Sequence, residues 1–506
     1  MAGQKLDRRS VVGGLSALTG FAAAGRAAGA ARRPNIVFFM GEGLRADEFG
    51  FMGAPLLKTP NMDRLARTGT VFRNAFVTNA LCLPSRATFL TGAYSHTTGA
   101  TTNEEATLPI SFPVVTDLLR QSGYETAFIG KSHVSGALLD HPWDYYFGFR
   151  GQADYLNPVV TERTGEGGAT TRVYRNTYVD DLLTDRATAW LEGRTGDKPF
   201  CLFLWFYAPH APFYRPRRML TRFNGMKVPV PKDFDEDLTN YEGKPRAVAE
   251  ATNKIGTTRV FSDMPRSLEE LVKDHYAGVE ANDESVGQVM GVLERKGMAD
   301  DTLVMLSSDH GFFLGEHTFY DKRLMYEPSI RVPMILRLPG RVRAGQVRNE
   351  MVLNVDAAPT LLEFAGLPVP SQMQGRSFAG LAAGRPAPDW RKDWLYEYYE
   401  YPGYENVRPN RGVRTERYKL IHYFLDPEEF ELYDLATDPG EDHNLYGRPG
   451  MEALTAQLKA RLTALRAETG DAYVYKPSRS PRPSIAFDPP TTVPQPWRPQ
   501  SVEPRR

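Results

Sequence analysis

Cysteine is scarce in this sequence of 506 residues, which contains only Cys82 and Cys201. Two cysteines in a chain of this length cannot build a disulfide framework, and their spacing fits no zinc site. Excess charge is also lacking, because 61 lysines and arginines balance 61 aspartates and glutamates, so no overall charge favours nucleic acid as a partner. Beyond the first 30 residues no apolar run is long enough to cross a bilayer, and we expect no membrane span in the mature protein.

Residues 1–30 have the composition of a targeting segment. Arg8 and Arg9 precede an apolar, glycine-containing stretch at 11–24, and Ala28-Gly29-Ala30 offers small residues for cleavage. This pattern is typical of a twin-arginine export signal, which predicts a periplasmic or secreted protein. The alternative is a disordered tail, rich in alanine and glycine, on a cytoplasmic protein.

From Pro34 onward, short apolar runs alternate with helical patterns. We predict buried strands at 36–40, 200–207, 303–306 and 334–336. We predict helices from Thr59-Pro60 to Gly69, at 114–121, at 180–191, and from a capping box at Ser267 to near Gly297. The alternation predicts an α/β fold, in which a large, mostly parallel sheet is sandwiched by helices, for a main domain at 31–387.

The pattern changes after about residue 388. Short aromatic runs at 396–401, 418–423 and 430–433 are separated by turns, and a helical segment at 452–468 follows them. These features predict a small antiparallel sheet with one packed helix, forming a C-terminal α+β subdomain at 388–475. The tail at 476–506 is rich in proline, serine and arginine, and we expect it either to wrap over the surface or to be disordered.

The most informative stretch is Cys82-Leu83-Pro84-Ser85-Arg86. It predicts a cysteine in a turn just before a helix, and helix N-termini attract anions and lower the pKa of a thiol. Arg86 adds a bidentate donor for a tetrahedral oxyanion. The stretch therefore indicates a nucleophile in a site that handles anions, with a buried structural cysteine as the alternative. Cys201 lies within an apolar run and is predicted to be packed in the core.

This stretch, extended by Leu90-Thr91-Gly92, resembles the signature of the type I sulfatases of the alkaline phosphatase superfamily. In that family a formylglycine-generating enzyme oxidises the cysteine to formylglycine (3-oxoalanine) before folding. Further segments resemble the family in chain order: Pro34-Asn35-Ile36-Val37, 58–66, Gly130-Lys131-Ser132-His133, Ala208-Pro209-His210-Ala211-Pro212, Ser308-Asp309-His310-Gly311, 314–317, Lys322, Tyr326-Glu327, 331–333, 414–419 and 431–435.

The resemblance implies an alkaline-phosphatase-like fold and a hydrolase that releases sulfate from a sulfuric ester. Such cleavage needs a nucleophile, neutralisation of charge on the sulfuryl oxygens and a proton for the leaving oxygen. By resemblance, Arg86 and Lys131 hold the geminal diol of formylglycine, and Lys322 and His210 contact the sulfate and the leaving oxygen. His133 is then the base that takes a proton from the second hydroxyl, which expels sulfate.

A divalent metal is also implied, with Glu42, Cys82, Asp309 and His310 at ligand positions. Hard oxygen ligands favour calcium, and magnesium is the second choice. The sequence departs from the family at one point, because two aspartates usually follow the first strand, whereas here Gly41-Glu42-Gly43 does. Gly43 supplies no ligand, and we expect water or a second oxygen of Glu42 to fill that place, or the family member to be degenerate.

For the substrate the sequence offers two basic clusters, Arg215, Arg217 and Arg218, and Arg408, Arg411 and Arg414 beside a tyrosine-rich run. Arginine with tyrosine suits sulfated sugars, while a solvated surface is the alternative. The segments 397–402 and 412–415 resemble bacterial N-acetylglucosamine-6-O-sulfatases more weakly. We therefore expect a sulfatase acting on sulfated glycans, with three alternatives: a small aryl or alkyl sulfatase, a phosphonate or phosphodiester hydrolase, or a non-catalytic binder of sulfated polysaccharide.

Overall fold

The computed structural model describes residues 33–54, 56–103, 112–133, 141–149, 151–165, 167–236, 238, 243–254, 267–403 and 405–478. The predicted export signal at 1–30 lies outside these residues, as does the tail beyond residue 478. The described residues from Pro34 onward form one compact unit. Within the described residues, no helix has both the length and the apolarity that crossing a membrane requires.

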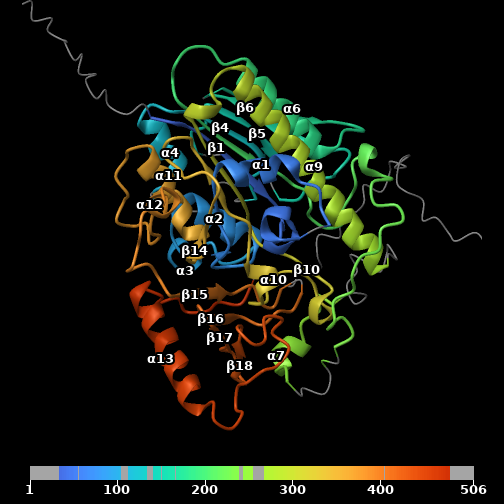
Figure 1. Ribbon diagram of the computed structural model, residues 1–506, viewed down its shortest axis with the longest axis vertical. Helices are drawn as coiled ribbons and strands as arrows, with labels where there is room; N and C mark the ends of the chain where they lie inside the picture. The colour runs from blue at the N-terminus through green and yellow to red at the C-terminus, as the bar shows by residue number, and fades with distance from the viewer. Residues whose placement is uncertain are drawn as a thin grey trace, which may run out of the picture. The chain divides into compact units, whose positions relative to one another are not determined.

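One large mixed sheet organises this unit (Figure 1). Its strand order is β13-β2-β12-β9-β1-β8-β4-β5-β6-β7. The central strands β9, β1, β8, β4 and β5 are parallel, and β12, β6 and β7 add antiparallel pairs toward the edges. The strands are β1 (Asn35–Gly41), β2 (Thr70–Phe72), β4 (Glu125–Lys131), β5 (Tyr145–Phe149), β6 (Val159–Thr164), β7 (Thr170–Val173), β8 (Phe200–Trp205), β9 (Thr302–Ser308), β12 (Ile335–Arg337) and β13 (Gln346–Arg348).

Both faces of the sheet are covered, as the alternation along β1 shows. Ile36, Phe38 and Met40 join the core that includes α2, α4 and α11. Val37 and Phe39 join the core that includes α1, α6 and α9. Each fully buried large apolar side chain contributes about 1.5–3 kcal/mol, so the continuous apolar runs of the central strands stabilise both interfaces. The predicted α/β sandwich is confirmed.

Four of the main helices begin and end close to their predicted positions: α1 (Pro60–Thr68), α4 (Val115–Gln121), α6 (Val179–Glu192) and α9 (Leu268–Arg295). The helix expected at Cys82 is α2 (Cys82–Thr91), and α11 (Ala357–Phe364) was not predicted. Shorter elements are α3 (Ser95–Thr98), α7 (Arg246–Ala249), α10 (Glu327–Ile330), α12 (Ala379–Ala382) and the paired strands β3 (Ala75–Phe76) with β14 (Val352–Leu353) and β10 (Phe313–Leu314) with β11 (Tyr320–Asp321).

Helix capping differs from the prediction at α1. The Thr59 side chain accepts no hydrogen bond from the helix. Instead the carboxylate of Asp283, on α9, accepts the backbone N–H groups of Asn61 at 3.1 Å and Met62 at 2.7 Å. A distant carboxylate thus satisfies the free amides of the helix start, which local sequence cannot reveal. At α9 the predicted cap is present, because Ser267 Oγ accepts from the Glu270 N–H at 3.2 Å.

The C-terminal region is a four-stranded antiparallel sheet, β15-β16-β17-β18, against which α13 packs (Figure 1). Its elements are β15 (Asp393–Tyr398), β16 (Asn410–Thr415), β17 (Tyr418–Tyr423), β18 (Glu429–Asp434) and α13 (Glu452–Glu468). The predicted antiparallel sheet and helix are confirmed, but β15 ends at Tyr398 rather than at residue 401. Strand β16 was not predicted, because Val413 is its one strongly apolar residue.

Candidate active site

Four parallel strands carry predicted site residues at the same edge of the sheet. Glu42 follows β1, Asp309 follows β9 and Lys131 is the last residue of β4. His210 lies in the turn after β8. Because β9, β1, β8 and β4 are neighbours in that order, their carboxyl ends place these side chains in one region, where ligands bind in open α/β sheets.

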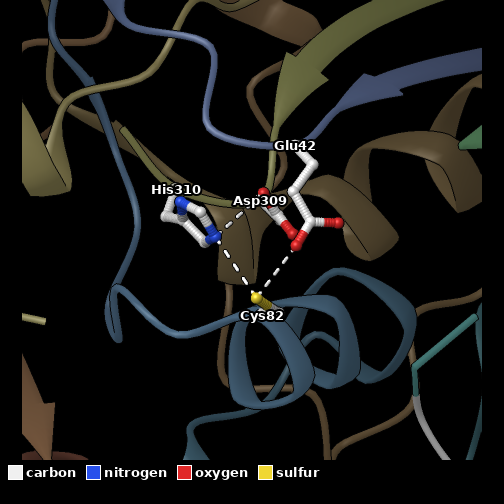
Figure 2. Close-up of side chains that lie close together, drawn as sticks. All are labelled: Glu42, Cys82, Asp309 and His310. Carbon is white, nitrogen blue, oxygen red and sulfur yellow. Dashed lines mark hydrogen bonds and ion pairs between the residues drawn. The ribbon is translucent and has the colours of Figure 1, made fainter. Parts of the chain in front are cut away.

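Cys82 faces this edge from the start of helix α2, whose residues are all buried. Its Sγ lies 3.0 Å from Glu42 Oε1 and 3.4 Å from His310 Nε2 (Figure 2). Together with Asp309, these residues offer four ligand atoms that all lie within 4.8 Å of one another. The four predicted metal-ligand positions are therefore brought together, although they come from three separate segments of the chain.

The thiol of Cys82 is not activated as the sequence predicted. Burial and the neighbouring carboxylate of Glu42 raise its pKa to about 12. The favourable effect of a helix N-terminus is confined to the first turn and modest in size, so complete burial beside a negative charge outweighs it. An unmodified Cys82 is therefore a neutral thiol at neutral pH and a poor nucleophile.

Arg86 and Lys131 bind the two carboxylates of the site. Arg86 donates from Nε to Asp309 Oδ2 at 2.9 Å and from Nη2 to Glu42 Oε2 at 2.7 Å. Lys131 Nζ donates to Glu42 Oε1 and, at 2.9 Å, to Gln152 Oε1. Burial raises the pKa of Glu42, but the charges of Lys131 and Arg86 outweigh burial and hold it well below its usual range. Glu42 is therefore ionised.

His310 has the tautomer that a metal ligand needs. Its Nδ1 lies 2.7 Å from the carbonyl oxygen of Gly311, which can only accept, so Nδ1 carries the proton and the lone pair lies on Nε2. Burial lowers the pKa of His310 to about 4, so the ring is neutral at neutral pH. Two carboxylates, a neutral imidazole nitrogen and the position of Cys82 thus form a donor set that fits a divalent cation.

Gly43, where the family usually has a second aspartate, has no room for a ligand. Its φ of +83° favours glycine, and an added Cβ would lie 3.1 Å from Phe312 Cδ2 and 3.7 Å from His310 Cε1. The backbone N–H of Gly43 donates to Asp309 Oδ1 at 3.3 Å. Position 43 therefore orients Asp309 through its amide, and Phe312 makes the tight contact with the place where a side chain would begin.

Three further predicted residues lie within electrostatic reach of this cluster. Burial and the charge of Lys131 hold the pKa values of His133 and His210 well below their usual range, and both rings are neutral. His210 Nε2 is 3.5 Å from Glu42 Oε1. His133 is 8% exposed, and its Nδ1 has no hydrogen-bond partner among the described residues. Both rings can therefore accept a proton, as a general base must.

Lys322 completes the set. Its Nζ lies 2.8 Å from Asp321 Oδ1. Although burial lowers the pKa of Lys322, the charge of Asp321, with a smaller contribution from Glu42, outweighs burial and raises it. Lys322 therefore keeps its ammonium charge inside the protein, which suits it to bind an oxyanion.

The sequence did not reveal three residues that contact the two buried cationic side chains, Arg86 and Lys131. The guanidinium of Arg86 lies 5.4 Å from the centre of the Trp205 ring, and the ammonium of Lys131 lies 5.5 Å from that of Tyr207. Gln152 accepts from Lys131. The two aromatic residues lie in an apolar run that predicts only core packing, and nothing in the local sequence distinguishes Gln152.

Every arginine of the predicted basic clusters except Arg217 is paired with an acid rather than gathered into an open anion site. Arg215 pairs with Asp274, and Arg218 pairs with Asp181 and Glu284. The second cluster pairs in the same way: Arg408 with Glu429, Arg411 with Asp471 and Arg414 with Glu327. These five arginines therefore have structural partners, and the interpretation of the clusters as sugar-binding patches loses its support.

Comparisons with known proteins agree with this geometry. The model of the family Sulfatase matches residues 34–367, and that of N-sulphoglucosamine sulphohydrolase, C-terminal, matches residues 315–468. An N-acetylglucosamine-6-O-sulfatase from Bacteroides thetaiotaomicron is 34% identical over 87% of this chain and 87% of its own length. An ulvan-active sulfatase from Formosa agariphila is 28% identical, over 87% and 82%.

Among solved structures, one of a protein bound to its substrate, D-glucosamine-2-N,6-O-disulfate, superimposes with a TM-score of 0.80. It is 33% identical in sequence and covers 87% of this chain and 99% of its own. The strand-edge cluster around Cys82, the alkaline-phosphatase-like sheet and these likenesses lead to one conclusion: this chain is a sulfatase, and it belongs to the formylglycine-dependent sulfatase family of the alkaline phosphatase superfamily.

Proposed function

We propose that this sulfatase releases sulfate from 6-O-sulfated glucosamine residues of glycans, using formylglycine made from Cys82 and a divalent cation. One observation carries the proposal: Glu42, Cys82, Asp309 and His310 converge within 4.8 Å, beside two buried cations. The choice of substrate is supported by the relative that is an N-acetylglucosamine-6-O-sulfatase and by the structural neighbour bound to a 6-O-sulfated glucosamine.

Glu42, Asp309 and His310, with the modified residue 82, would hold the cation. We propose calcium, with magnesium as the second choice, because the two carboxylates are hard oxygen ligands. When bound, such a cation neutralises charge on the sulfate oxygens and favours ionisation of a hydroxyl nucleophile. Formylglycine, as its hydrate, supplies that hydroxyl and a second one through which sulfate can be expelled.

The surrounding residues have different roles in the proposed reaction. Arg86 and Lys131, fixed by the two carboxylates and by each other, orient residue 82. Lys322, whose ammonium form is favoured by Asp321, donates hydrogen bonds to the sulfate, and His210 lies beside the leaving oxygen. His133, kept neutral by burial, accepts the proton whose removal lets sulfate leave.

The decisive experiment measures free sulfate released from a panel of defined sulfated sugars. We expect release from 6-O-sulfated N-acetylglucosamine and glucosamine and little from 2-O-sulfated sugars. A small aryl sulfate and a matched phosphonate monoester are run alongside. Faster turnover of the aryl sulfate or the phosphonate than of every sulfated sugar would refute the glycan substrate, and Cys82→Ala is the inactive control.

We also propose that the enzyme matures and acts in separate compartments. The twin-arginine pattern at Arg8 and Arg9 supports export to the periplasm or beyond, and the Cys82 motif supports modification by a formylglycine-generating enzyme. Changing Arg8 and Arg9 to lysine should leave precursor in the cytoplasm, which immunoblots of fractionated cells would show. Normal delivery of that variant would refute this route.

The division of the chain into a main domain at 31–387, a C-terminal subdomain at 388–475 and a tail at 476–506 is likewise a proposal, which limited proteolysis can test.

A further inference from the structure

One strand of the C-terminal sheet hydrogen-bonds to two separate catalytic segments. Strand β15 is the edge strand of the C-terminal sheet, on the side that faces the helices of the main sheet (Figure 1). The hydroxyl of Tyr396, on β15, accepts a hydrogen bond from the backbone N–H of Ala80 at 3.3 Å. The same hydroxyl donates to the backbone oxygen of Arg323 at 2.8 Å. Ala80 lies just before Cys82, and Arg323 directly follows Lys322, so one oxygen atom joins the segments of both residues.

The segment around Lys322 needs such support because its backbone is strained. Asp321 has a φ of +71° and Arg323 a φ of +86°, a region of positive φ that is unfavourable for residues other than glycine. Residues keep such conformations only where their surroundings impose them. Lys322 is therefore held between two left-handed residues, and its direction depends on what fixes them.

The remaining contacts of the Lys322 segment come from Glu405, in the loop that follows β15, from Asn253 and from within the segment. Arg323 Nη1 donates to Asp321 Oδ2 at 2.6 Å and to Glu405 Oε2 at 2.5 Å. Asn253 Nδ2 donates to the backbone oxygen of Lys322 at 3.2 Å. These bonds and that of Tyr396 are made by buried groups, so water cannot replace them when one is lost.

The segment around Cys82 is reached by the same strand and loop. The Glu397 N–H donates to the backbone oxygen of Thr78 at 2.9 Å. Glu400 Oε2 accepts the N–H of Asn103 at 2.6 Å, and Asn103 Oδ1 accepts that of Leu83 at 3.0 Å. Leu83 is the second residue of α2, so these contacts fix the start of the helix that presents Cys82.

We infer that Tyr396 is a positioning residue, whose hydroxyl sets the placement of Lys322 relative to Cys82. The inference rests on the proposed function, in which residue 82 supplies the nucleophile and Lys322 binds the sulfate. A shift between these two groups misaligns attack without removing either group, and an error of about 1 Å can lower the rate up to a hundredfold. The C-terminal sheet is thereby part of the catalytic apparatus.

The test compares two variants that each lose one hydroxyl oxygen, Tyr396→Phe and the control Tyr423→Phe. Tyr423 is equally buried in the same sheet, and its hydroxyl donates to Glu431 Oε1 at 2.7 Å rather than to the backbone of either catalytic segment. We expect Tyr396→Phe to lower kcat about tenfold and to raise KM about threefold, because a displaced Lys322 also binds the sulfate less well. Tyr423→Phe should keep wild-type kcat while losing a similar amount of thermal stability.

A double-mutant cycle separates positioning from general stability. If Tyr396 acts through Lys322, then Tyr396→Phe should lower kcat/KM less than about twofold when Lys322 is already alanine. An undiminished effect in the Lys322→Ala background would overturn the inference, as would equal kcat values for Tyr396→Phe and Tyr423→Phe.

Failure of the proposed function would look different. If the wild type releases sulfate from no ester, the proposed function is refuted. The inference is then tested with inorganic sulfate as the probe, by calorimetry. Several-fold weaker binding to Tyr396→Phe than to Tyr423→Phe would support it, and equal affinity would overturn it.

Discussion

The two cysteines of this chain lie in equally buried but opposite surroundings. Cys201 lies within β8, in register with Ile36 on β1 and Thr126 on β4, and burial alone raises its pKa. Cys82 has ionised Glu42 and the neutral ring of His310 within 3.4 Å. Burial therefore does not distinguish a structural cysteine from a functional one. The polar groups around the sulfur atom distinguish the two, and these groups lie just past the ends of strands that are far from Cys82 in sequence.

Replacing each cysteine by alanine should give the largest contrast. We expect Cys82→Ala to lower kcat at least about a thousandfold and to leave the fold intact. Cys201→Ala should keep activity and lower the free energy of unfolding by about 1–2 kcal/mol, through the cavity it leaves. Sulfate release and denaturant unfolding measure the two effects. Peptide mass spectrometry should find the aldehyde at position 82 alone, and full activity of a chain with an unmodified Cys82 would contradict the mechanism.

The ligand set around Cys82 predicts the next largest effect. We expect a chelator to abolish activity and added calcium or magnesium to restore it. Glu42→Gln should raise the metal concentration needed for half activity at least about tenfold, because affinity of such sites depends on ligand charge. Activity titrated against free metal gives both numbers. An unchanged midpoint in Glu42→Gln would mean that Glu42 is not a ligand.

A substitution at Gly43 tests whether the metal site around Cys82 can accept a further ligand. Gly43→Asp should lower the free energy of unfolding by about 1–3 kcal/mol, because of its positive φ and the contact with Phe312. It should not tighten metal binding. Gly53→Ala is the matched control, since Gly53 also has a positive φ but its added Cβ meets nothing within 4 Å. Tighter metal binding by Gly43→Asp at wild-type stability would show that the position tolerates a ligand.

The smallest effect concerns the pH profile. Because burial and the charge of Lys131 lower the pKa of His133, the base stays neutral below the ordinary histidine value of about 6.5. Activity is then lost only as the pH falls through the lowered pKa, and we expect the acid limb of kcat/KM to lie below that ordinary histidine value. Rates measured between pH 4 and 8 test this. An acid limb at or above pH 6.5 would exclude His133 in its native surroundings as the base.

The fold could be predicted from the sequence, and so could the proximity of most residues of the candidate site, for physical reasons. Runs of apolar residues such as those of β1 and β9 reveal buried parallel strands, and polar residues just past their ends, such as Asp309, reveal the binding edge. The thiol pKa was predicted wrongly, because the local effect of a helix start was visible and the distant carboxylate of Glu42 was not. The role inferred for Tyr396 could not be predicted either, since it depends on backbone atoms of residues far from it in sequence.

The central place of β1 also has a consequence for how the chain folds. Strand β1 is made early in synthesis, but both strands beside it come much later, and Gly41 is 267 residues from its neighbour Ser308. At the usual rate of protein synthesis, 5–20 residues per second, β9 is made roughly 15–50 s after β1. The apolar surface of β1 lacks this partner strand until then. Pairings of such long range slow folding and expose aggregation-prone segments. The catalytic edge is therefore completed late in folding, and yields of soluble enzyme should respond to synthesis rate and chaperone supply.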